Sequence, residues 1–196
     1  MESADSSPTV GRGRIVVISG CMFAGKTARL IAHLHVAHDA GRRVFACKHC
    51  LDTRYDTAEL RTHDGRRFPA HPVASAGEIA ISAGDAEVVG IDEAQFFGRA
   101  LLEVCRALAA EGRDVVVAGI DHDAWGQPFP PLPQLKELAD AVEPQYAPCT
   151  VCGRPAEYSQ RVTPVRAGDM VGGPADYKPR CEQCFQPLPG PAPVYA

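Results

Sequence analysis

The fold of this chain is decided by one stretch, Gly20-Cys21-Met22-Phe23-Ala24-Gly25-Lys26-Thr27, which matches the phosphate-loop pattern G-x-x-x-x-G-K-[ST]. Residues 14–19 before it are apolar and rich in β-branched side chains, which predicts a buried strand. Residues 27–40 after it carry apolar side chains at helical spacing. A strand, a glycine-rich turn and a helix direct backbone N–H groups toward an anion. The sequence therefore predicts binding of a nucleoside triphosphate, with Lys26 reaching the β- and γ-phosphates and the Thr27 hydroxyl ligating Mg²⁺.

A pair of acidic residues, Asp92-Glu93, directly follows another predicted strand, residues 87–91. A carboxylate in this position is the usual partner of the Mg²⁺ ion at a phosphate loop, which is the role we predict for Asp92. A buried Glu93 beside the metal can act as a general base toward an attacking hydroxyl. The alternative is that Glu93 only caps the next helix or faces solvent.

The cysteines suggest a metal site. Cys149-Thr150-Val151-Cys152 and Cys181-Glu182-Gln183-Cys184 are two C-x₂-C pairs, a pattern typical of a closed structural zinc site. Disulfide bonds are the alternative; the phosphate loop and the lack of a secretory signal favour a reducing compartment and hence zinc. We interpret the other cysteines as small buried apolar side chains; they are Cys21, Cys47, Cys50 and Cys105.

Composition narrows the class of protein. The 196 residues are enough for one domain or for one domain with a small lobe, and 45% of them are hydrophobic and 22% charged. The formal net charge of −4 argues against a nucleic-acid partner. No apolar run approaches the length of a membrane span, and the polar N-terminus is unlike a secretory signal. We therefore expect a cytoplasmic enzyme without a membrane partner.

Along the chain, apolar runs typical of strands alternate with helical patterns. Further strands are predicted at residues 43–47 and 114–120, and helices at 75–82, 100–110 and 132–139, whereas 48–72 is expected to be a long polar functional loop. This alternation predicts an α/β fold, a parallel sheet with helices on both faces and its site at the carboxyl ends of the strands. We expect a flexible tail at 1–13, an ATP-binding domain at 14–146, a zinc-binding lobe at 147–185 and a flexible proline-rich tail at 186–196.

Several short motifs occur in one order between Arg14 and Phe185. Besides the phosphate loop and the cysteine pairs they are Asp52-Thr53-Arg54-Tyr55, Thr62-His63-Asp64, Ile91-Asp92-Glu93-Ala94-Gln95-Phe96-Phe97, Gly119-Ile120-Asp121, Pro128-Phe129, and Val171-Gly172-Gly173 with Tyr177. In this series the sequence resembles the zinc-containing thymidine kinases of bacteria, animal cytosol and large DNA viruses. The resemblance implies a RecA-like phosphate-loop domain followed by a zinc-ribbon-like lobe that carries a lasso loop.

The resemblance also implies a reaction, transfer of the γ-phosphoryl group of ATP to the 5′-hydroxyl of thymidine to give dTMP. Glu93 would be the catalytic base, and Asp52 would help to order the loop that carries Arg54. The nucleotide would be bound by the phosphate loop (Gly20 to Thr27), Arg54, Asp92, Glu93, Ala94 and Gln95. Thymidine would be bound by Met22, Phe96, Ile120, Phe129, Met170, Val171, Gly172, Gly173 and Tyr177. For the apolar members, ordinary core packing is the alternative.

One departure from the family pattern affects the base pocket. Where the family usually has an aromatic residue, this chain has Ala124, with Trp125 one position later. We expect thymidine to remain the best substrate, with selectivity relaxed toward bulkier nucleosides.

Other functions stay open at this point. One is a kinase that prefers deoxyuridine or a modified deoxynucleoside, and another is a catalytically silent nucleotide-binding protein. A DNA-dependent ATPase with a zinc ribbon is a third, which the acidic charge disfavours. By the resemblance alone, we expect a homotetramer and feedback inhibition by dTTP.

Overall fold

The computed structural model describes residues 11–52, 58–62, 64–164, 172–190 and 193–195. Within these ranges the largest sheet has six strands in the order β5-β2-β6-β7-β1-β8, and every pairing is parallel. The strands are β1 (Ile15–Gly20), β2 (Val44–His49), β5 (His71–Val73), β6 (Val88–Asp92), β7 (Asp114–Ile120) and β8 (Ala141–Gln145). This confirms the predicted parallel α/β sheet.

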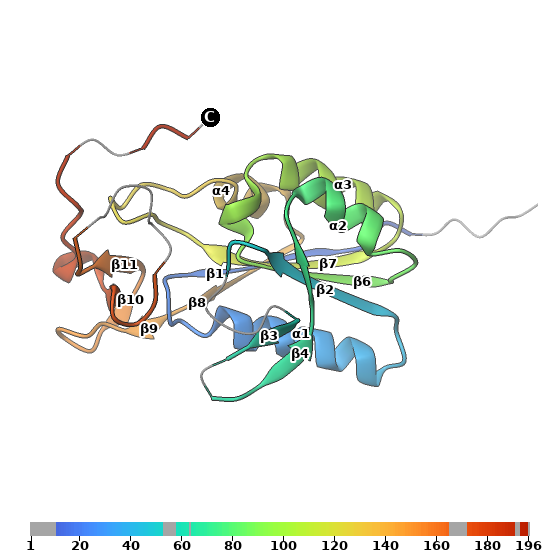
Figure 1. Ribbon diagram of the computed structural model, residues 1–196, viewed down its shortest axis with the longest axis horizontal. Coiled ribbons are helices and arrows are strands. Elements are labelled where there is room, and N and C mark those ends of the chain that lie inside the picture. The colour runs from blue at the N-terminus through green and yellow to red at the C-terminus, as the bar shows by residue number, and fades with distance from the viewer. Residues whose placement is uncertain (1–10, 53–57, 63, 165–171, 191–192, 196) are drawn as a thin grey trace, which may run out of the picture.

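Helices cover both faces of the sheet (Figure 1). On one face lies α1 (Lys26–Asp39), and on the other lie α2 (Ala76–Ser82), α3 (Ala100–Ala110) and α4 (Leu132–Leu138). Each face has its own apolar core: Leu30, Ile31 and Leu34 of α1 on one side, and Ile79, Leu101, Leu108, Leu132 and Leu135 on the other. The central strands are buried on both faces, which explains why they are continuous apolar runs in the sequence.

Two glycines in the central strands let helices approach the sheet closely. A Cβ atom at Gly90 of β6 would lie 2.7 Å from Cδ2 of Leu34, and one at Gly119 of β7 would lie 2.5 Å from Cδ2 of Leu132. Leu34 and Leu132 are fully buried in these positions. The small residues therefore set the depth at which α1 and α4 pack.

Residues 48–72 are not one long loop, so that prediction was wrong. They contain an antiparallel hairpin, β3 (Glu59–Arg61) and β4 (Arg67–Pro69), as well as the start of β5. Leu60 and Phe68 face each other across the hairpin and are buried against the core beneath α1. Strands of three residues are too short to show an alternating pattern, which is why the sequence did not indicate them.

Strand β8 was also missed. It forms the edge of the sheet beside β1, and the exposure of its residues alternates along the strand. It contains a proline, Pro144, which argues against a strand in sequence-based reasoning but is tolerated at an edge. Cys21, Cys47 and Cys105 are buried as predicted, whereas Cys50 is exposed because it lies in the turn after β2.

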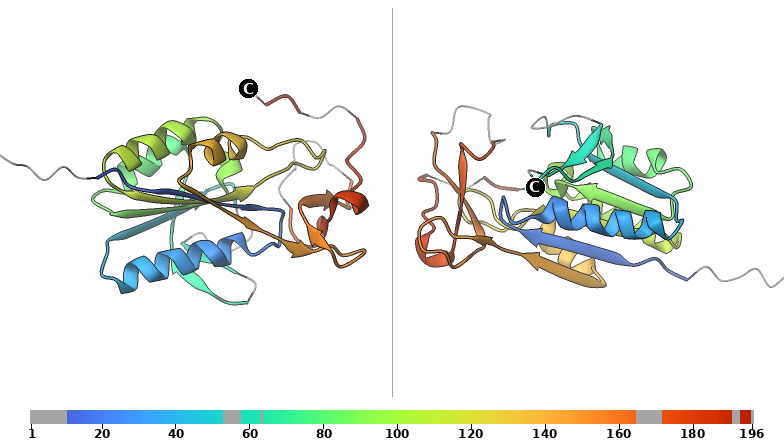
Figure 2. Two further views of the ribbon diagram at one scale, coloured as in Figure 1. Left: turned by 180° about the vertical axis from the view of Figure 1, so that it is seen from behind. Right: turned by 90° about the horizontal axis from the view of Figure 1, so that it is seen from below.

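The C-terminal part of the chain forms a small lobe at the end of the sheet where the parallel strands finish (Figures 1 and 2). It consists of β9 (Ala147–Pro148), β10 (Pro155–Ala156), β11 (Tyr158–Arg161), β12 (Tyr177–Arg180) and the 3-10 helix η2 (Glu182–Cys184). The phosphate loop contacts this lobe, since the Cys21 thiol donates to the carbonyl oxygen of Ala156 at 3.3 Å and the Met22 N–H donates to Oγ of Ser159 at 2.9 Å. The domain boundaries derived from the sequence stay predictions.

Among the described residues, no helix is long and apolar enough to cross a membrane.

Candidate active site

The glycines of the phosphate loop are required by its backbone. Gly20 has a φ of 145°, and a Cβ atom there would lie 2.2 Å from the carbonyl oxygen of Gln145 on β8. Gly25 has a φ of 84° directly before α1, a conformation that glycine adopts without strain. The Lys26 side chain is buried and its Nζ donates to the carbonyl oxygen of Cys21 at 2.7 Å. Burial lowers the pKa of this amine, while the nearby Glu93 carboxylate opposes the shift.

Two oxygen-bearing side chains meet between the ends of β1 and β6. The Thr27 hydroxyl donates to Oδ2 of Asp92 at 2.9 Å, so the two predicted Mg²⁺ ligands are adjacent. Burial, and then the charge of Glu93, raises the pKa of Asp92 to about 7. The Thr27 hydroxyl and the buried Asp92 carboxylate offer oxygen ligands, which are those that Mg²⁺ prefers.

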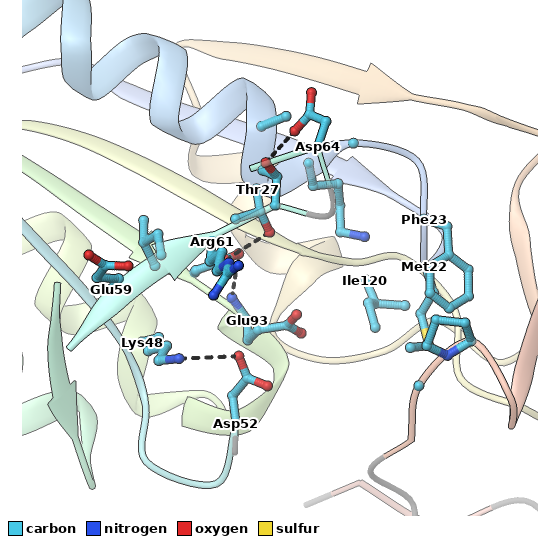
Figure 3. A pocket seen from close by; sticks show the side chains of 18 residues that line it. Met22, Phe23, Thr27, Lys48, Asp52, Glu59, Arg61, Asp64, Glu93 and Ile120 are labelled. Atoms are coloured by element: carbon cyan, nitrogen blue, oxygen red, sulfur yellow. Dashed lines mark hydrogen bonds and ion pairs between the residues drawn. The ribbon is translucent and has the colours of Figure 1, made fainter. Parts of the chain in front are cut away.

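The Glu93 side chain is buried and held by the amide of Gln95. Glu93 has a left-handed backbone, with a φ of 54°, where β6 gives way to the 3-10 helix η1 (Ala94–Phe97). The Gln95 side-chain N–H donates to Oε2 of Glu93, and its Oε1 accepts the backbone N–H of Ile120 at 3.2 Å. Gln95 therefore connects the carboxylate to the end of β7. Figure 3 shows the Glu93 carboxylate pointing toward Ile120, away from Lys48.

Two cavities meet at Glu93. The first, of about 470 Å³, lies over the phosphate loop, and we call it the loop cavity; its lining includes Gly25, Lys26, Thr27, Asp92 and Glu93. The second, of about 300 Å³, is lined largely by apolar and aromatic side chains, and we call it the aromatic cavity. Met22, Glu93 and Ile120 line both cavities. A carboxylate at this border can act on a group that enters from either side.

The predicted nucleoside-binding residues gather in the aromatic cavity. Its lining includes Met22, Phe96, Ile120, Phe129, Gly172 and Tyr177. Gly173 lines the loop cavity instead, and Gln95 lines the aromatic cavity rather than the loop cavity. Ala94 is fully buried in the core beneath the sheet edge. Arg54, Met170 and Val171 lie outside the described residues.

Two cations of the loop cavity were missed by the sequence analysis. Lys48 is only 3% exposed and its Nζ lies 4.0 Å from Oδ2 of Asp52. It stands at the carboxyl end of β2, opposite Asp92 in the register of the sheet, and a charged residue in that position of a buried strand was a usable signal. Arg61 lines the same cavity from β3, and no signal marked it because the hairpin itself was not recognised.

The lasso segment lies between the two cysteine pairs and is described up to residue 164 and again from residue 172. A side-chain hydrogen bond joins these two described parts. Oδ2 of Asp176 accepts the N–H of Gly173 at 3.1 Å, and Oδ1 accepts the Thr163 hydroxyl at 2.9 Å. A Cβ atom at Gly172 would lie 2.9 Å from Cε2 of Tyr177, so only glycine allows this approach. Gly172 and Tyr177, in the second of these two parts, both line the aromatic cavity.

The four cysteines of the two C-x₂-C pairs converge in the lobe. The sulfur atoms of Cys149, Cys152, Cys181 and Cys184 all lie within 4.8 Å of one another. The Cys152 and Cys181 sulfurs are 3.5 Å apart, too far for a disulfide bond. The Arg154 guanidinium donates to the Cys152 sulfur at 3.3 Å, and this hydrogen bond lowers the pKa of the thiol. The cluster is compatible with a tetrahedral zinc site, which takes thiolates.

Comparison with known proteins agrees with this geometry. A family model described as thymidine kinase matches residues 13–185. The chain belongs to the thymidine kinase family. Curated relatives named thymidine kinase include those of Rhodothermus sp. (strain ITI 518), 45% identical and covering 89% of this chain and 82% of the relative, and of Bacteroides thetaiotaomicron, 42% identical with 89% and 87% covered. The relative from Coprothermobacter proteolyticus is 45% identical, with 86% and 88% covered.

Membership of the thymidine kinase family confirms the resemblance on which the sequence analysis relied, and it makes the chain an ATP-dependent kinase. Among solved structures, a DNA replication initiation factor is similar with a TM-score of 0.41 and 15% identity, covering 69% of this chain and 41% of that chain. A likeness at that level supports no conclusion about function.

Proposed function

We propose that this thymidine kinase family member transfers the γ-phosphoryl group of ATP to the 5′-hydroxyl of thymidine, giving dTMP. The observation that carries the proposal is the position of Glu93, whose buried carboxylate lies where the loop cavity meets the aromatic cavity. Phosphoryl transfer requires donor and acceptor to be aligned across such a border, with charge neutralised on the donor side. The loop cavity would hold the triphosphate and the aromatic cavity would hold the nucleoside.

On the donor side, the backbone of the loop from Gly20 to Thr27 and the Lys26 amine would bind the phosphates. Lys26 would exchange its hydrogen bond to the Cys21 carbonyl oxygen for phosphate oxygens. Thr27 and Asp92 would hold Mg²⁺, which neutralises charge on the β- and γ-phosphates when bound. Arg54 would also contact the phosphates, whereas the buried position of Ala94 and the place of Gln95 in the aromatic cavity argue against direct contacts of these two predicted residues with the nucleotide.

On the acceptor side, Glu93 would accept the proton of the 5′-hydroxyl as that oxygen attacks the γ-phosphorus. Gln95 supports this role because its amide N–H donates to the carboxylate and restricts its orientation. Met22, Phe96, Ile120, Phe129 and Tyr177 would contact the base and the sugar. The lasso residues Met170, Val171, Gly172 and Gly173 would bind the base through their backbone.

The lobe would bind zinc through Cys149, Cys152, Cys181 and Cys184. The convergence of the four sulfur atoms supports this, and the closed ligand set assigns zinc a structural role. We further propose a cytoplasmic homotetramer that is inhibited by its distal product dTTP and has no nucleic-acid or membrane partner.

The test is ATP-dependent phosphorylation of a panel of deoxynucleosides, with Glu93→Gln as the control. We expect thymidine to be the best substrate and its turnover to collapse in the variant. ATP binding without turnover of any deoxynucleoside would contradict the proposed reaction. Preferential turnover of deoxyuridine or of a modified deoxynucleoside would retain the reaction class and replace the substrate.

A further inference from the structure

The C-terminal segment returns to the aromatic cavity and is attached there at two points. The N–H of Leu188 donates to the carbonyl oxygen of Ala124 at 3.1 Å. Seven residues later, the Tyr195 hydroxyl donates to Oδ2 of Asp123 at 2.7 Å. Both acceptors belong to the loop that follows β7. At both points, the described residues of the segment therefore lie against the loop after β7.

Asp123 is a rigid attachment point. It is 4% exposed, and its Oδ1 accepts the N–H groups of Trp125 at 2.9 Å and Gln127 at 2.8 Å. These bonds orient the carboxylate within its own turn, so that Oδ2 faces the tyrosine. A hydrogen bond from a phenol to a carboxylate is stronger than one between neutral groups. The Tyr195 hydroxyl is thus bound to a carboxylate whose orientation is set within the loop after β7.

The ring of Tyr195 forms part of the cavity wall. Its centroid is 5.2 Å from that of Phe129, with the planes inclined by 35°, and both residues line the aromatic cavity. Ala124, which neighbours the attachment point, also lines the cavity and is only 3% exposed. A residue with a single methyl group in the wall leaves space that the tail can occupy. Pro193 of the same segment contributes to the lining as well.

Because the aromatic cavity is small, the loss of one side chain from its wall changes the space that is left for a base. At about 300 Å³, the cavity is at the lower end of the range of roughly 300–1,000 Å³ found for small-molecule sites. Removing one aromatic ring from such a wall would enlarge the space for the base and would remove apolar contact area.

We propose that Tyr195, attached to Asp123, is a specificity-determining residue that closes the wall of the aromatic cavity and limits the size of the pyrimidine deoxynucleoside base it accepts. This rests on the proposed function, in which the cavity holds the nucleoside.

The test compares Tyr195→Ala with Val194→Ala, a matched variant on the same segment whose side chain is 96% exposed. KM and kcat are measured for thymidine, for a deoxyuridine with a C5 propyl group, for deoxyguanosine and for ATP. The loss of apolar contacts in a binding pocket changes kcat/KM by roughly 10-fold or more. We therefore expect the thymidine KM of Tyr195→Ala to rise about 10-fold. For at least one nucleoside with a larger base, kcat/KM should increase relative to that for thymidine. The KM for ATP should not change. Val194→Ala should match the wild type.

Tyr195→Phe separates the ring from its attachment. It keeps the apolar wall and removes the hydrogen bond to Asp123, so we expect a rise of about 3-fold in the thymidine KM, smaller than for alanine. Unchanged thymidine KM and unchanged selectivity in Tyr195→Ala would overturn the proposal. A lower thymidine KM in that variant would also overturn it, because the tail would then be competing with the nucleoside.

Thymidine binding to the same variants, measured by calorimetry, separates this proposal from the proposed reaction. If the wild type turns over no nucleoside, the proposed reaction fails, and weaker thymidine binding by Tyr195→Ala than by Val194→Ala still supports the wall. Equal binding by the two variants, with turnover intact in the wild type, refutes the wall and leaves the reaction standing.

Discussion

The loop cavity and the aromatic cavity share the carboxylate of Glu93, but the chain builds them in different ways. The floor of the loop cavity comes from the carboxyl ends of parallel strands, where Thr27 and Asp92 meet across β7. The aromatic cavity is assembled from η1, the loop after β7, the cysteine lobe and the C-terminal segment. The first cavity depends on the rigid sheet, and the second depends on how separate segments dock. We therefore expect the chemistry to be more robust than the base specificity.

The largest effect should come from Glu93, the carboxylate at the border of the two cavities. Glu93→Gln keeps the size of the side chain but removes the proton acceptor, so we expect kcat to fall by roughly 10²- to 10⁴-fold. KM values for ATP and thymidine should change little. Steady-state kinetics test this, with Glu137→Gln on the exposed surface of α4 as the matched control. Turnover close to that of the wild type would mean that another group accepts the proton.

Removal of the zinc ion proposed for the lobe should weaken thymidine binding more than ATP binding. Zinc sites of this kind contribute directly to folding free energy, so chelation or Cys181→Ser should loosen the lobe that carries Ser159 and Tyr177. We expect the thymidine KM to rise about 30-fold and the ATP KM by a smaller factor, since Cys21 and Met22 of the phosphate loop also contact the lobe. The comparison of the two KM values is the measurement. Equal loss on both sides would show that the phosphate loop depends on the lobe as strongly as the base site does.

A more moderate effect is expected where Gln95 links the two sides. Gln95→Ala removes one hydrogen bond that orients the Glu93 carboxylate, so we expect kcat to fall about 10-fold with KM values nearly unchanged. Gln127→Ala, at an exposed position of the loop after β7, is the control. If the thymidine KM changes more than kcat does, Gln95 contacts the nucleoside instead of positioning the base.

The smallest effect should come from a surface cluster whose residues line neither cavity. Glu143 of β8 accepts a hydrogen bond from Nε of Arg29 at 2.6 Å and lies 3.1 Å from Nε2 of His33, and the Arg29 bond lowers the pKa of Glu143 to about 2 from 4.5. Because the pKa is lower in the folded protein, the contribution to stability is present above pH 4.5 and is lost as the pH falls toward 2.

These side chains are partly exposed, 47% for Arg29 and 24% for Glu143, so solvent screening reduces the contribution to less than about 1 kcal/mol. Glu143→Gln should lower the free energy of unfolding at pH 7 by that amount and by less at each step of acidification below pH 4.5. Denaturant unfolding as a function of pH measures this. A change in either KM would show that the cluster is coupled to the active site.

The same contrast explains how far the sequence could predict the molecule. The phosphate loop, the Asp92-Glu93 pair and the C-x₂-C pairs each require particular residue types at a fixed local spacing. Each could therefore be recognised from a short segment of sequence. Six lining residues of the aromatic cavity were named as thymidine-binding through the family resemblance, whereas its Tyr195 and Pro193 were not. Lys48 and Arg61 of the loop cavity were not predicted either. The hairpin β3–β4 and the edge strand β8 left no periodic signal.

The sequence by itself determined the parallel α/β sheet, the phosphate loop and the two C-x₂-C pairs, because strand burial, the geometry of an anion-binding turn and the spacing within each cysteine pair constrain residues that are close along the chain. Only the tertiary structure decided that Gln95 holds Glu93 and that the phosphate loop is hydrogen-bonded to the C-terminal lobe. It also decided that Tyr195 completes the wall of the aromatic cavity beside Ala124. Cys21 lies 135 residues from Ala156, Asp123 lies 72 residues from Tyr195, and the Gln95 amide that holds Glu93 is itself bonded to Ile120, 25 residues away. These contacts form only when the whole chain is packed.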